Sequence, residues 1–171
     1  MIFLNIGSNL DSKFGNRFDN INQTLNLLKL ENLKVLKISD FYETPSYPNN
    51  KNPKFINIAV QIECEISPIE LLKILKSIEK KMDRTLTLKN EPRTCDIDII
   101  DFKRLIIKND KITLPHPRAH NRNFVLYPLM QICPNWIHPE SNKKIEFLIK
   151  KLTIKTRNEI TRMKESAILK K

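Results

Sequence analysis

Glycine is nearly absent from this chain of 171 residues, which contains only Gly7 and Gly15. The backbone loops that cradle phosphate groups need several glycines, in patterns such as G-x-x-x-x-G-K-S/T and G-x-G-x-x-G. Neither pattern occurs, which excludes the phosphate-binding loops of P-loop and Rossmann proteins. Any phosphate that this protein binds must therefore be held by side chains and metal ions.

Cysteine is also scarce, and its three positions, Cys64, Cys95 and Cys133, are widely separated. The number is odd and no C-x-x-C pair occurs, so the sequence gives no sign of a disulfide framework. Cys64 and Cys95 fall in apolar, strand-like runs. We interpret the three cysteines as reduced core residues of a cytosolic protein.

Long hydrophobic runs are missing as well. No segment approaches the roughly 18 consecutive apolar residues of a membrane span, and Met1 opens into a strand-like run rather than a signal peptide. We therefore expect a soluble, cytoplasmic protein that does not contact membranes. As a separate expectation, we take the protein to be a monomer. The length fits a single domain over residues 1–171 with one core, in which residues 153–171 form a polar, Lys-rich tail that is weakly ordered at its end.

Acidic residues are outnumbered, with 19 Asp and Glu against 30 Lys and Arg and a net charge of +11. Such a charge is compatible with nucleic-acid binding. However, 22 of the basic residues are Lys and most are scattered along the chain. This distribution favours a solvated basic surface that attracts an anionic small substrate over a nucleic-acid interface.

Hydrophobic periodicity predicts strands over residues 1–6, 35–42, 55–64 and 94–102, and helices over residues 18–30 and 67–84. The second helix begins at Ser67, where S-P-I-E forms a capping box with Pro in the first turn. The order strand, helix, strand, strand, helix, strand is the ferredoxin-like pattern. We predict an α+β sandwich with a mostly antiparallel sheet flanked by helices, followed by a hairpin over 105–114, a helix over 123–132 and an amphipathic segment over 145–152.

The segment Pro92 to Asp101, P-R-T-C-D-I-D-I-I-D, contains the first candidate site. Side chains alternate along a strand, so Asp96 and Asp98 share one face and lie roughly 6.6 Å apart at their Cα atoms. Mg2+ takes one or two carboxylates and completes its shell with water and substrate phosphates. Arg93 then faces the remaining phosphate charge. Taken alone, however, the pair also fits an exposed strand that carries two acids.

A second cluster packs two histidines and two arginines into residues 116–122. His116 and His120 have the spacing of zinc ligands on a helix, but Pro117 disfavours the helical conformation for His116. Recognition of an anion suits His116, Arg118 and Arg122 better, because each donates hydrogen bonds to phosphate oxygens. The alternative is a basic loop that caps a helix. Together with the acidic pair, the cluster supplies the cationic half of a metal-triphosphate site.

Five motifs occur in a fixed order: I-G-S-N at 6–9, F-Y-E-T-P at 41–45, F-x-N-x-A at 55–59, P-R-T-x-D-I-D-I at 92–99, and L-P-H-P-R-x-H-x-R-x-F-V-L-x-P-L at 114–129. With these motifs the chain resembles the 6-hydroxymethyl-7,8-dihydropterin pyrophosphokinases from about residue 2 to residue 152. The resemblance implies transfer of pyrophosphate from ATP to the hydroxymethyl oxygen of a reduced pterin, with release of AMP, in folate biosynthesis.

The resemblance also implies roles for individual residues. Asp96 and Asp98 would bind two Mg2+ ions, with Arg93 and Arg122 beside them in the catalytic set. The pterin would be bound by Thr44, Pro45, Tyr47, Phe55, Asn57 and Phe124, and ATP by Glu79, Arg84, Lys89, Lys111, Thr113 and His116. Aromatic faces suit a flat heterocycle, although Phe55 and Phe124 taken alone also fit ordinary core packing.

One loop departs from the family. The family commonly reads R-W-G-P-R-T where this chain has K-N-E-P-R-T at 89–94, and Leu86 stands where a further arginine is expected. Lys89 offers a point charge in place of a bidentate guanidinium. The altered loop leaves open a degenerate, inactive pyrophosphokinase. The net charge of +11 leaves open a second alternative, a basic RNA-binding module on a ferredoxin-like sheet. The second lacks the aromatic strand pattern of RNA-recognition domains, so we expect small-molecule substrates and no nucleic acid.

Overall fold

A six-stranded sheet organises the fold, which we describe from a computed structural model for residues 1–47, 49–83 and 91–168. The elements follow in the order β1 (Ile2–Ser8), α1 (Arg17–Leu30), β2 (Lys34–Ile38), β3 (Asp40–Thr44), β4 (Phe55–Glu63), α2 (Pro68–Lys81), β5 (Asp96–Phe102), β6 (Ile107–Lys108), β7 (Thr113–Leu114), a 3-10 turn (Ala119–Asn121), α3 (Asn123–Ile132), α4 (Ile145–Lys151), α5 (Ile154–Asn158) and β8 (Thr161–Ser166). The sheet order is β5-β1-β4-β3-β8, and β2 also pairs with β4. The strand pairs of this sheet are antiparallel, as predicted.

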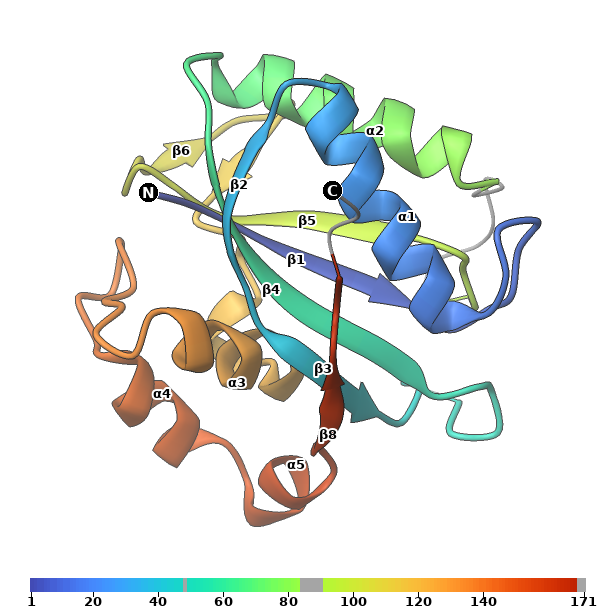
Figure 1. Ribbon diagram of the computed structural model, residues 1–171. Helices are drawn as coiled ribbons and strands as arrows, with labels where there is room; N and C mark the ends of the chain where they lie inside the picture. Colours follow the sequence, from blue (N-terminus) through green and yellow to red (C-terminus); the bar gives the residue numbers. More distant parts are fainter. Residues whose placement is uncertain (48, 84–90, 169–171) are drawn as a thin grey trace.

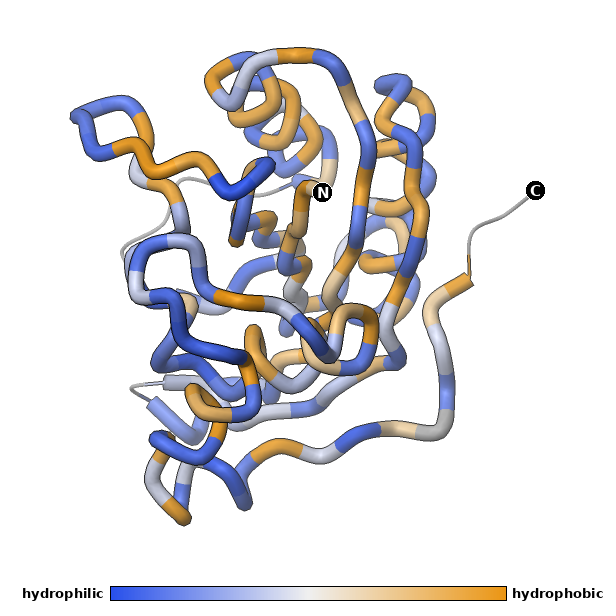
Figure 2. Tube along the Cα trace, turned by 90° about the vertical axis from the view of Figure 1, so that its left-hand side faces the viewer, coloured by the Kyte–Doolittle hydropathy of each residue, from blue (hydrophilic) through white to orange (hydrophobic). Residues whose placement is uncertain are grey.

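Helices cover both faces of the sheet (Figure 1). On one face, α1 and α2 pack on alternate residues of β1, β4 and β5 and form the larger hydrophobic core. On the other face, α3 and α4 pack on Phe3, Ala59 and Ile100 and form a second, smaller core. Hydrophobic positions alternate with hydrophilic ones along the chain in Figure 2, as burial of one side of each element requires. The part of the second face that α3 leaves uncovered carries the polar residues described below.

The two long helices begin where the sequence places their caps. Ser67 accepts a hydrogen bond from the Glu70 N–H, and the Glu70 carboxylate accepts one from the Ser67 N–H, so the predicted capping box is present. Asn16 and Asp19 form the same arrangement at the start of α1. These caps satisfy N–H groups that have no partner inside the helix, and they fix the direction in which each helix crosses the sheet.

Three segments differ from the prediction. The predicted strand over 35–42 is divided at Ser39, whose N–H and hydroxyl both bond to Ala59 of β4, so that β2 and β3 pair with different parts of that strand. Helix α2 ends at Lys81 and β5 begins at Asp96, a little inside the predicted bounds. The tail forms α5 and β8 over residues 154–166; its last three residues lie outside the described residues.

All three cysteines are free thiols, but only Cys95 is fully buried. Cys64 and Cys133 are half-buried, which corrects the expectation that all three lie in the core. Burial raises the pKa of both of these thiols, so each is less nucleophilic than an exposed cysteine at neutral pH. Within the described ranges, no helix has both the length and the apolar composition needed to cross a bilayer.

Candidate functional site

The two predicted carboxylates lie side by side on one face of β5. In the pairing with β1, Asp96 is opposite Gly7 and Asp98 is opposite Asn5. Their side chains are 28% and 26% exposed, whereas the β5 residues that point to the other face belong to the larger core. The alternation predicted from the sequence therefore holds. It leaves two carboxylates accessible on the face that α1 and α2 do not cover.

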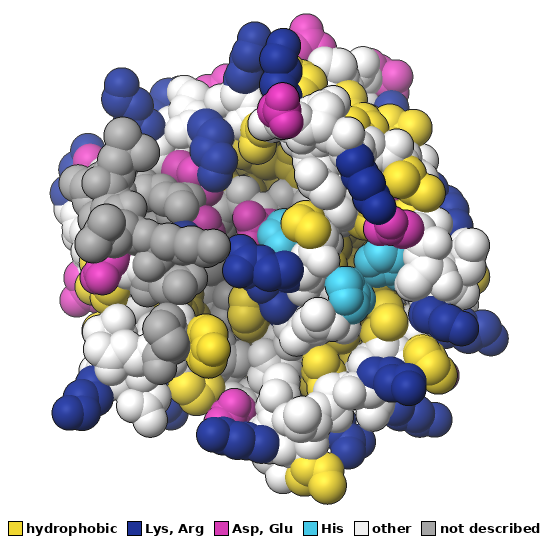
Figure 3. Space-filling model, turned by 180° about the vertical axis from the view of Figure 1, so that it is seen from behind, with side chains coloured by type: hydrophobic (Ala, Val, Ile, Leu, Met, Phe, Trp, Pro, Cys, Tyr) yellow, Lys and Arg dark blue, Asp and Glu magenta, His cyan; other side chains and the backbone are white. Residues whose placement is uncertain are grey.

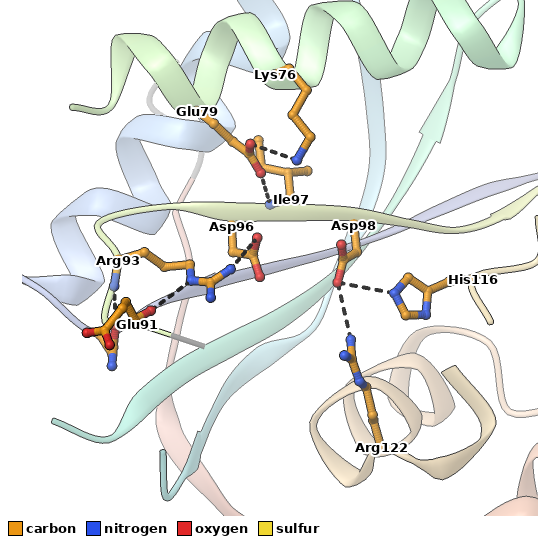
Figure 4. A network of polar contacts seen from close by, with 10 residues as sticks. Lys76, Glu79, Glu91, Arg93, Asp96, Ile97, Asp98, His116 and Arg122 are labelled. Atoms are coloured by element: carbon orange, nitrogen blue, oxygen red, sulfur yellow. Dashed lines mark hydrogen bonds and ion pairs between the residues drawn. The ribbon is translucent and has the colours of Figure 1, made fainter. Parts of the chain in front are cut away.

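Three cationic or polar donors surround these carboxylates (Figure 4). The Arg93 Nη1 atom lies 3.3 Å from Asp96 Oδ1, and the Arg122 Nη1 atom lies 3.4 Å from Asp98 Oδ2. His116 Nε2 lies 3.7 Å from the same Asp98 oxygen. On the face of the molecule seen in Figure 3, acidic, basic and histidine side chains gather around a hollow. The fold thus unites the acidic pair with the basic cluster about twenty residues further along the chain.

His116 is held in one orientation by the backbone. Its Nδ1 atom accepts a hydrogen bond from the Arg118 N–H at 3.1 Å, so the proton of the neutral imidazole is on Nε2 and points toward Asp98. Burial lowers the pKa of His116, Asp98 raises it, and Arg122 and Arg118 lower it further. At neutral pH the His116 imidazole of the free protein is therefore a neutral hydrogen-bond donor.

Arg122 precedes α3 and connects the acidic pair to an aromatic ring. Its guanidinium carbon lies 5.2 Å from the centre of the Phe124 ring, within the range of a cation–π contact. Burial lowers the pKa of the Arg122 guanidinium, and the charge of the Asp98 carboxylate raises it. The guanidinium stays charged, as arginines do in proteins. Phe124 is half-buried and packs against the smaller core. One arginine therefore contacts both predicted halves of the site.

The predicted pterin residues lie on β3 and β4, next to the acidic pair. Asn57 is opposite Gly7, which is itself opposite Asp96, so these three residues form one row across the sheet. The Asn57 Nδ2 atom donates to Thr44 Oγ1 at 3.2 Å. A Cβ atom on Gly7 would lie 2.9 Å from Asn57 Oδ1 and 3.6 Å from the Phe55 ring. Gly7 therefore leaves the room that Asn57 occupies.

The remaining predicted site residues differ in their exposure to solvent. Pro45 is half-buried, and Tyr47 is 84% exposed. Lys111 is exposed in the β6–β7 turn and Thr113 is half-buried on β7. Arg84 and Lys89 lie outside the described residues, as does the replacement of an arginine by Leu86.

The side chain of Glu79 binds the backbone of the edge strand β5. It is 3% exposed, and its Oε1 atom accepts a hydrogen bond from the Ile97 N–H at 2.8 Å, while Oε2 accepts one from Lys76. Strand β5 is an edge strand, whose outer N–H groups have no sheet partner. Glu79 thus ties α2 to the strand segment between the two catalytic candidates.

Sequence reasoning missed Asn9, which connects three segments. Its Oδ1 atom accepts from the Arg93 N–H at 2.7 Å, and its Nδ2 atom donates to Pro53 O at 2.9 Å and Ser46 Oγ at 3.2 Å. Asn9 is 2% exposed, so these bonds are protected from water. The sequence marks Asn9 as the last residue of the I-G-S-N motif but does not indicate its partners. Asn9 sets the position of the backbone from which Arg93 extends.

The donor set fits a hard divalent cation such as Mg2+. Asp96 and Asp98 offer carboxylate oxygens on one face, and each is about a quarter exposed. Among the described residues no group of three or more His, Cys, Asp and Glu side chains forms a closed metal site. A site with two carboxylates leaves the other coordination positions to water and phosphate oxygens, which is the usual arrangement for Mg2+.

Comparison with known proteins identifies the family of this chain. The sequence pattern of the 7,8-dihydro-6-hydroxymethylpterin-pyrophosphokinase (HPPK) family matches residues 3–134. A 2-amino-4-hydroxy-6-hydroxymethyldihydropteridine pyrophosphokinase of Bacillus subtilis is 38% identical over 125 residues, which cover 72% of this chain and 75% of that protein. A folic acid synthesis protein of Schizosaccharomyces pombe is 34% identical over 151 residues, 88% of this chain. The chain belongs to the HPPK family.

The relatives differ in length. The chain spans 20% of the S. pombe protein. A crystal structure of HPPK-DHPS from Plasmodium falciparum has the same fold, with a TM-score of 0.71 at 15% sequence identity; the match covers 94% of this chain and 46% of that one. The ferredoxin-like α+β sandwich predicted from the sequence is thus confirmed.

Proposed function

We propose that this protein transfers the diphosphate group of ATP to the hydroxymethyl oxygen of 6-hydroxymethyl-7,8-dihydropterin and releases AMP, as a step in folate biosynthesis. Family membership supports the reaction, and one observation carries it: Arg93, His116 and Arg122 converge on Asp96 and Asp98. In this reaction the substrate oxygen attacks the β-phosphorus, the bond from that phosphorus to the AMP oxygen breaks, and the hydroxyl proton passes to solvent.

The residues of the acidic face act by alignment and by neutralisation of charge. Asp96 and Asp98 would hold two Mg2+ ions, which neutralise phosphate charge and orient the triphosphate when bound. Arg93 and Arg122 then donate to the phosphate oxygens in place of the carboxylates that they contact in the free protein. His116 donates through Nε2. Such positioning supplies most of the rate acceleration for phosphoryl transfer without a strong base.

The pterin occupies the neighbouring part of the same face. Phe55 and Phe124 enclose the flat ring, and the amide of Asn57 bonds its polar edge. Thr44 fixes the orientation of Asn57 through their hydrogen bond. Pro45 and Tyr47 complete the pocket. ATP extends from the acidic pair away from the pterin and contacts Glu79, Lys111 and Thr113. Arg84 and Lys89, which lie outside the described residues, would also bind ATP.

The test is release of AMP by the purified protein with ATP, Mg2+ and the reduced hydroxymethylpterin. Asp96→Ala and Asp98→Ala should each lower the rate about a hundredfold or more, because bound metal contributes several kcal/mol to transition-state stabilisation. Both side chains are about a quarter exposed, so the midpoint of thermal unfolding should change little. No AMP above the Asp96→Ala background would reject the activity. Unfolding of either variant would assign the pair to structure instead.

We also propose that residues 1–171 act as one domain, as a cytoplasmic monomer, on small molecules rather than nucleic acid. The free cysteines support a reducing compartment. Light scattering that gives the mass of one chain, and a filter-binding titration with RNA at moderate salt that shows no retention, are the expected results. Micromolar RNA binding would instead favour an RNA-binding module.

A further inference from the structure

The C-terminal segment, residues 153–168, lies beyond the part of the chain that matches the family pattern, which ends at residue 134. This segment forms α5 and then joins the sheet next to β3 as β8 (Figure 1). Met163 and Ala167 of this segment pack against the larger core, and specific polar contacts attach the segment to β3 and α3.

The first attachment is to Asp40 at the start of β3. Asp40 Oδ2 accepts a hydrogen bond from Arg162 Nε at 2.7 Å and forms an ion pair with Arg162 Nη2 at 2.5 Å, and Oδ1 accepts a hydrogen bond from Ser166 Oγ at 2.5 Å. The Ser166 hydroxyl and the Arg162 guanidinium together lower the pKa of Asp40 against the opposing effect of burial. In the pairing of the two strands, Arg162 lies opposite Tyr42, which on its other side lies opposite Asn57.

The second attachment is to the start of α3. The Asn123 Nδ2 atom donates to the Thr156 carbonyl at 2.6 Å, and Asn123 Oδ1 accepts from the Phe124 N–H at 2.7 Å. Further along α3, Gln131 Oε1 accepts from the Asp40 N–H and from the Tyr42 hydroxyl, each at 3.0 Å. Helix α3, β3 and the C-terminal segment therefore form one connected polar network.

We propose that the C-terminal segment is a positioning element for the pterin half of the site, which holds Phe124 through Asn123 and the Thr44–Asn57 pair through β3. This inference rests on the proposed function. The sheet order decides which ligand is affected. Strand β8 is adjacent to β3, whereas Asp96 and Asp98 are on β5 at the opposite edge. Loosening of β8 should thus weaken pterin binding and leave ATP binding nearly unchanged. A segment that only stabilises the fold would show no such selectivity.

The experiment compares the dissociation constants of two ligands in the full-length protein. The double variant Arg162→Ala/Ser166→Ala removes the two partners that the C-terminal segment supplies to the Asp40 carboxylate. The dissociation constant of 6-hydroxymethylpterin, measured with saturating Mg2+ and an unreactive ATP analogue, should rise about tenfold, and that of the ATP analogue less than about twofold. Ser166→Ala alone keeps the ion pair and should give a smaller shift in the same direction. The single variant Arg162→Lys keeps a positive charge beside the Asp40 carboxylate and leaves Ser166 intact. It should therefore bind the pterin much more tightly than the double variant does.

Lys155→Ala is the matched control, because Lys155 pairs only with Glu159 of the same segment among the described contacts and its side chain is 85% exposed. It should leave both constants unchanged. Equal weakening of both ligands, or an unchanged pterin constant in Ser166→Ala and in the double variant, would overturn the inference. Failure of the unaltered protein to bind pterin at all would reject the proposed function itself.

Discussion

At the scale of single residues, the space left by Gly7 decides where Asn57 lies. A Cβ atom at residue 7 would come within 2.9 Å of Asn57 Oδ1, a distance that real Cβ atoms do not tolerate, and Asn57 is 3% exposed. Gly7→Ala should therefore displace the Asn57 amide, at a cost of about 1–3 kcal/mol in the free energy of unfolding. The KM for the pterin should rise much more than the KM for ATP.

The double variant Gly7→Ala/Asn57→Ala separates the two effects of that change. Without the Asn57 amide the new methyl group has room, so most of the lost stability should return, measured by urea unfolding. Pterin affinity should stay low because the amide that bonds the ring is gone. An unaltered pterin KM in the single variant would show that Asn57 does not contact the substrate.

At the scale of secondary-structure elements, the capping box of α2 sets the start of the helix that carries Glu79. Ser67→Ala removes the side-chain partner of the Glu70 N–H and should cost about 1 kcal/mol in the free energy of unfolding. Ser77→Ala is the matched control on the same helix, since Ser77 is exposed and Ala is the better helix former. A loss of stability as large in Ser77→Ala would contradict the role of the cap.

Elements with a strong local pattern could be predicted, and those held by distant partners could not. The alternation of β5 and the capping box of α2 are contained in a few consecutive residues, so the acidic face and the start of α2 followed from the sequence. The division at Ser39 depends on its bonds to Ala59. Strand β8 depends on Asp40, which is over a hundred residues away in the sequence. Such contacts leave no periodic signal.

The same distinction applies to the site. Asp96, Asp98 and the basic cluster were identifiable because charged residues of opposite sign recur at strand and loop positions that suit metal and phosphate. The role of Asn9 could not be predicted, because its partners Ser46, Pro53 and Arg93 come from two other segments. The fold brings these segments together, and Asn9 then connects the end of β1 to the backbone of Arg93.

At the scale of the whole molecule, the charge state of one buried histidine should make stability depend on pH. His138 is 4% exposed, its Nδ1 atom accepts hydrogen bonds from the backbone N–H groups of Glu140 and Ser141, and its ring packs edge-on against those of His120 and Trp136. Burial, and secondly the neighbouring His120, lower the pKa of His138. The folded protein thus holds this imidazole neutral, whereas the unfolded chain protonates it near its ordinary pKa of about 6.5.

The sign of the effect follows from proton linkage. Below about pH 6.5 the unfolded chain binds the proton that the folded protein refuses, so the free energy of unfolding should fall from pH 7 toward pH 5. In His138→Asn the amide oxygen can accept the same backbone N–H bonds without titrating, so this variant should be less stable at pH 7 but show a shallower fall. Urea unfolding at several pH values in this window, where most carboxylates stay ionised, measures both slopes. Parallel slopes would show that His138 is not the group responsible and would point to His116, whose pKa burial also lowers.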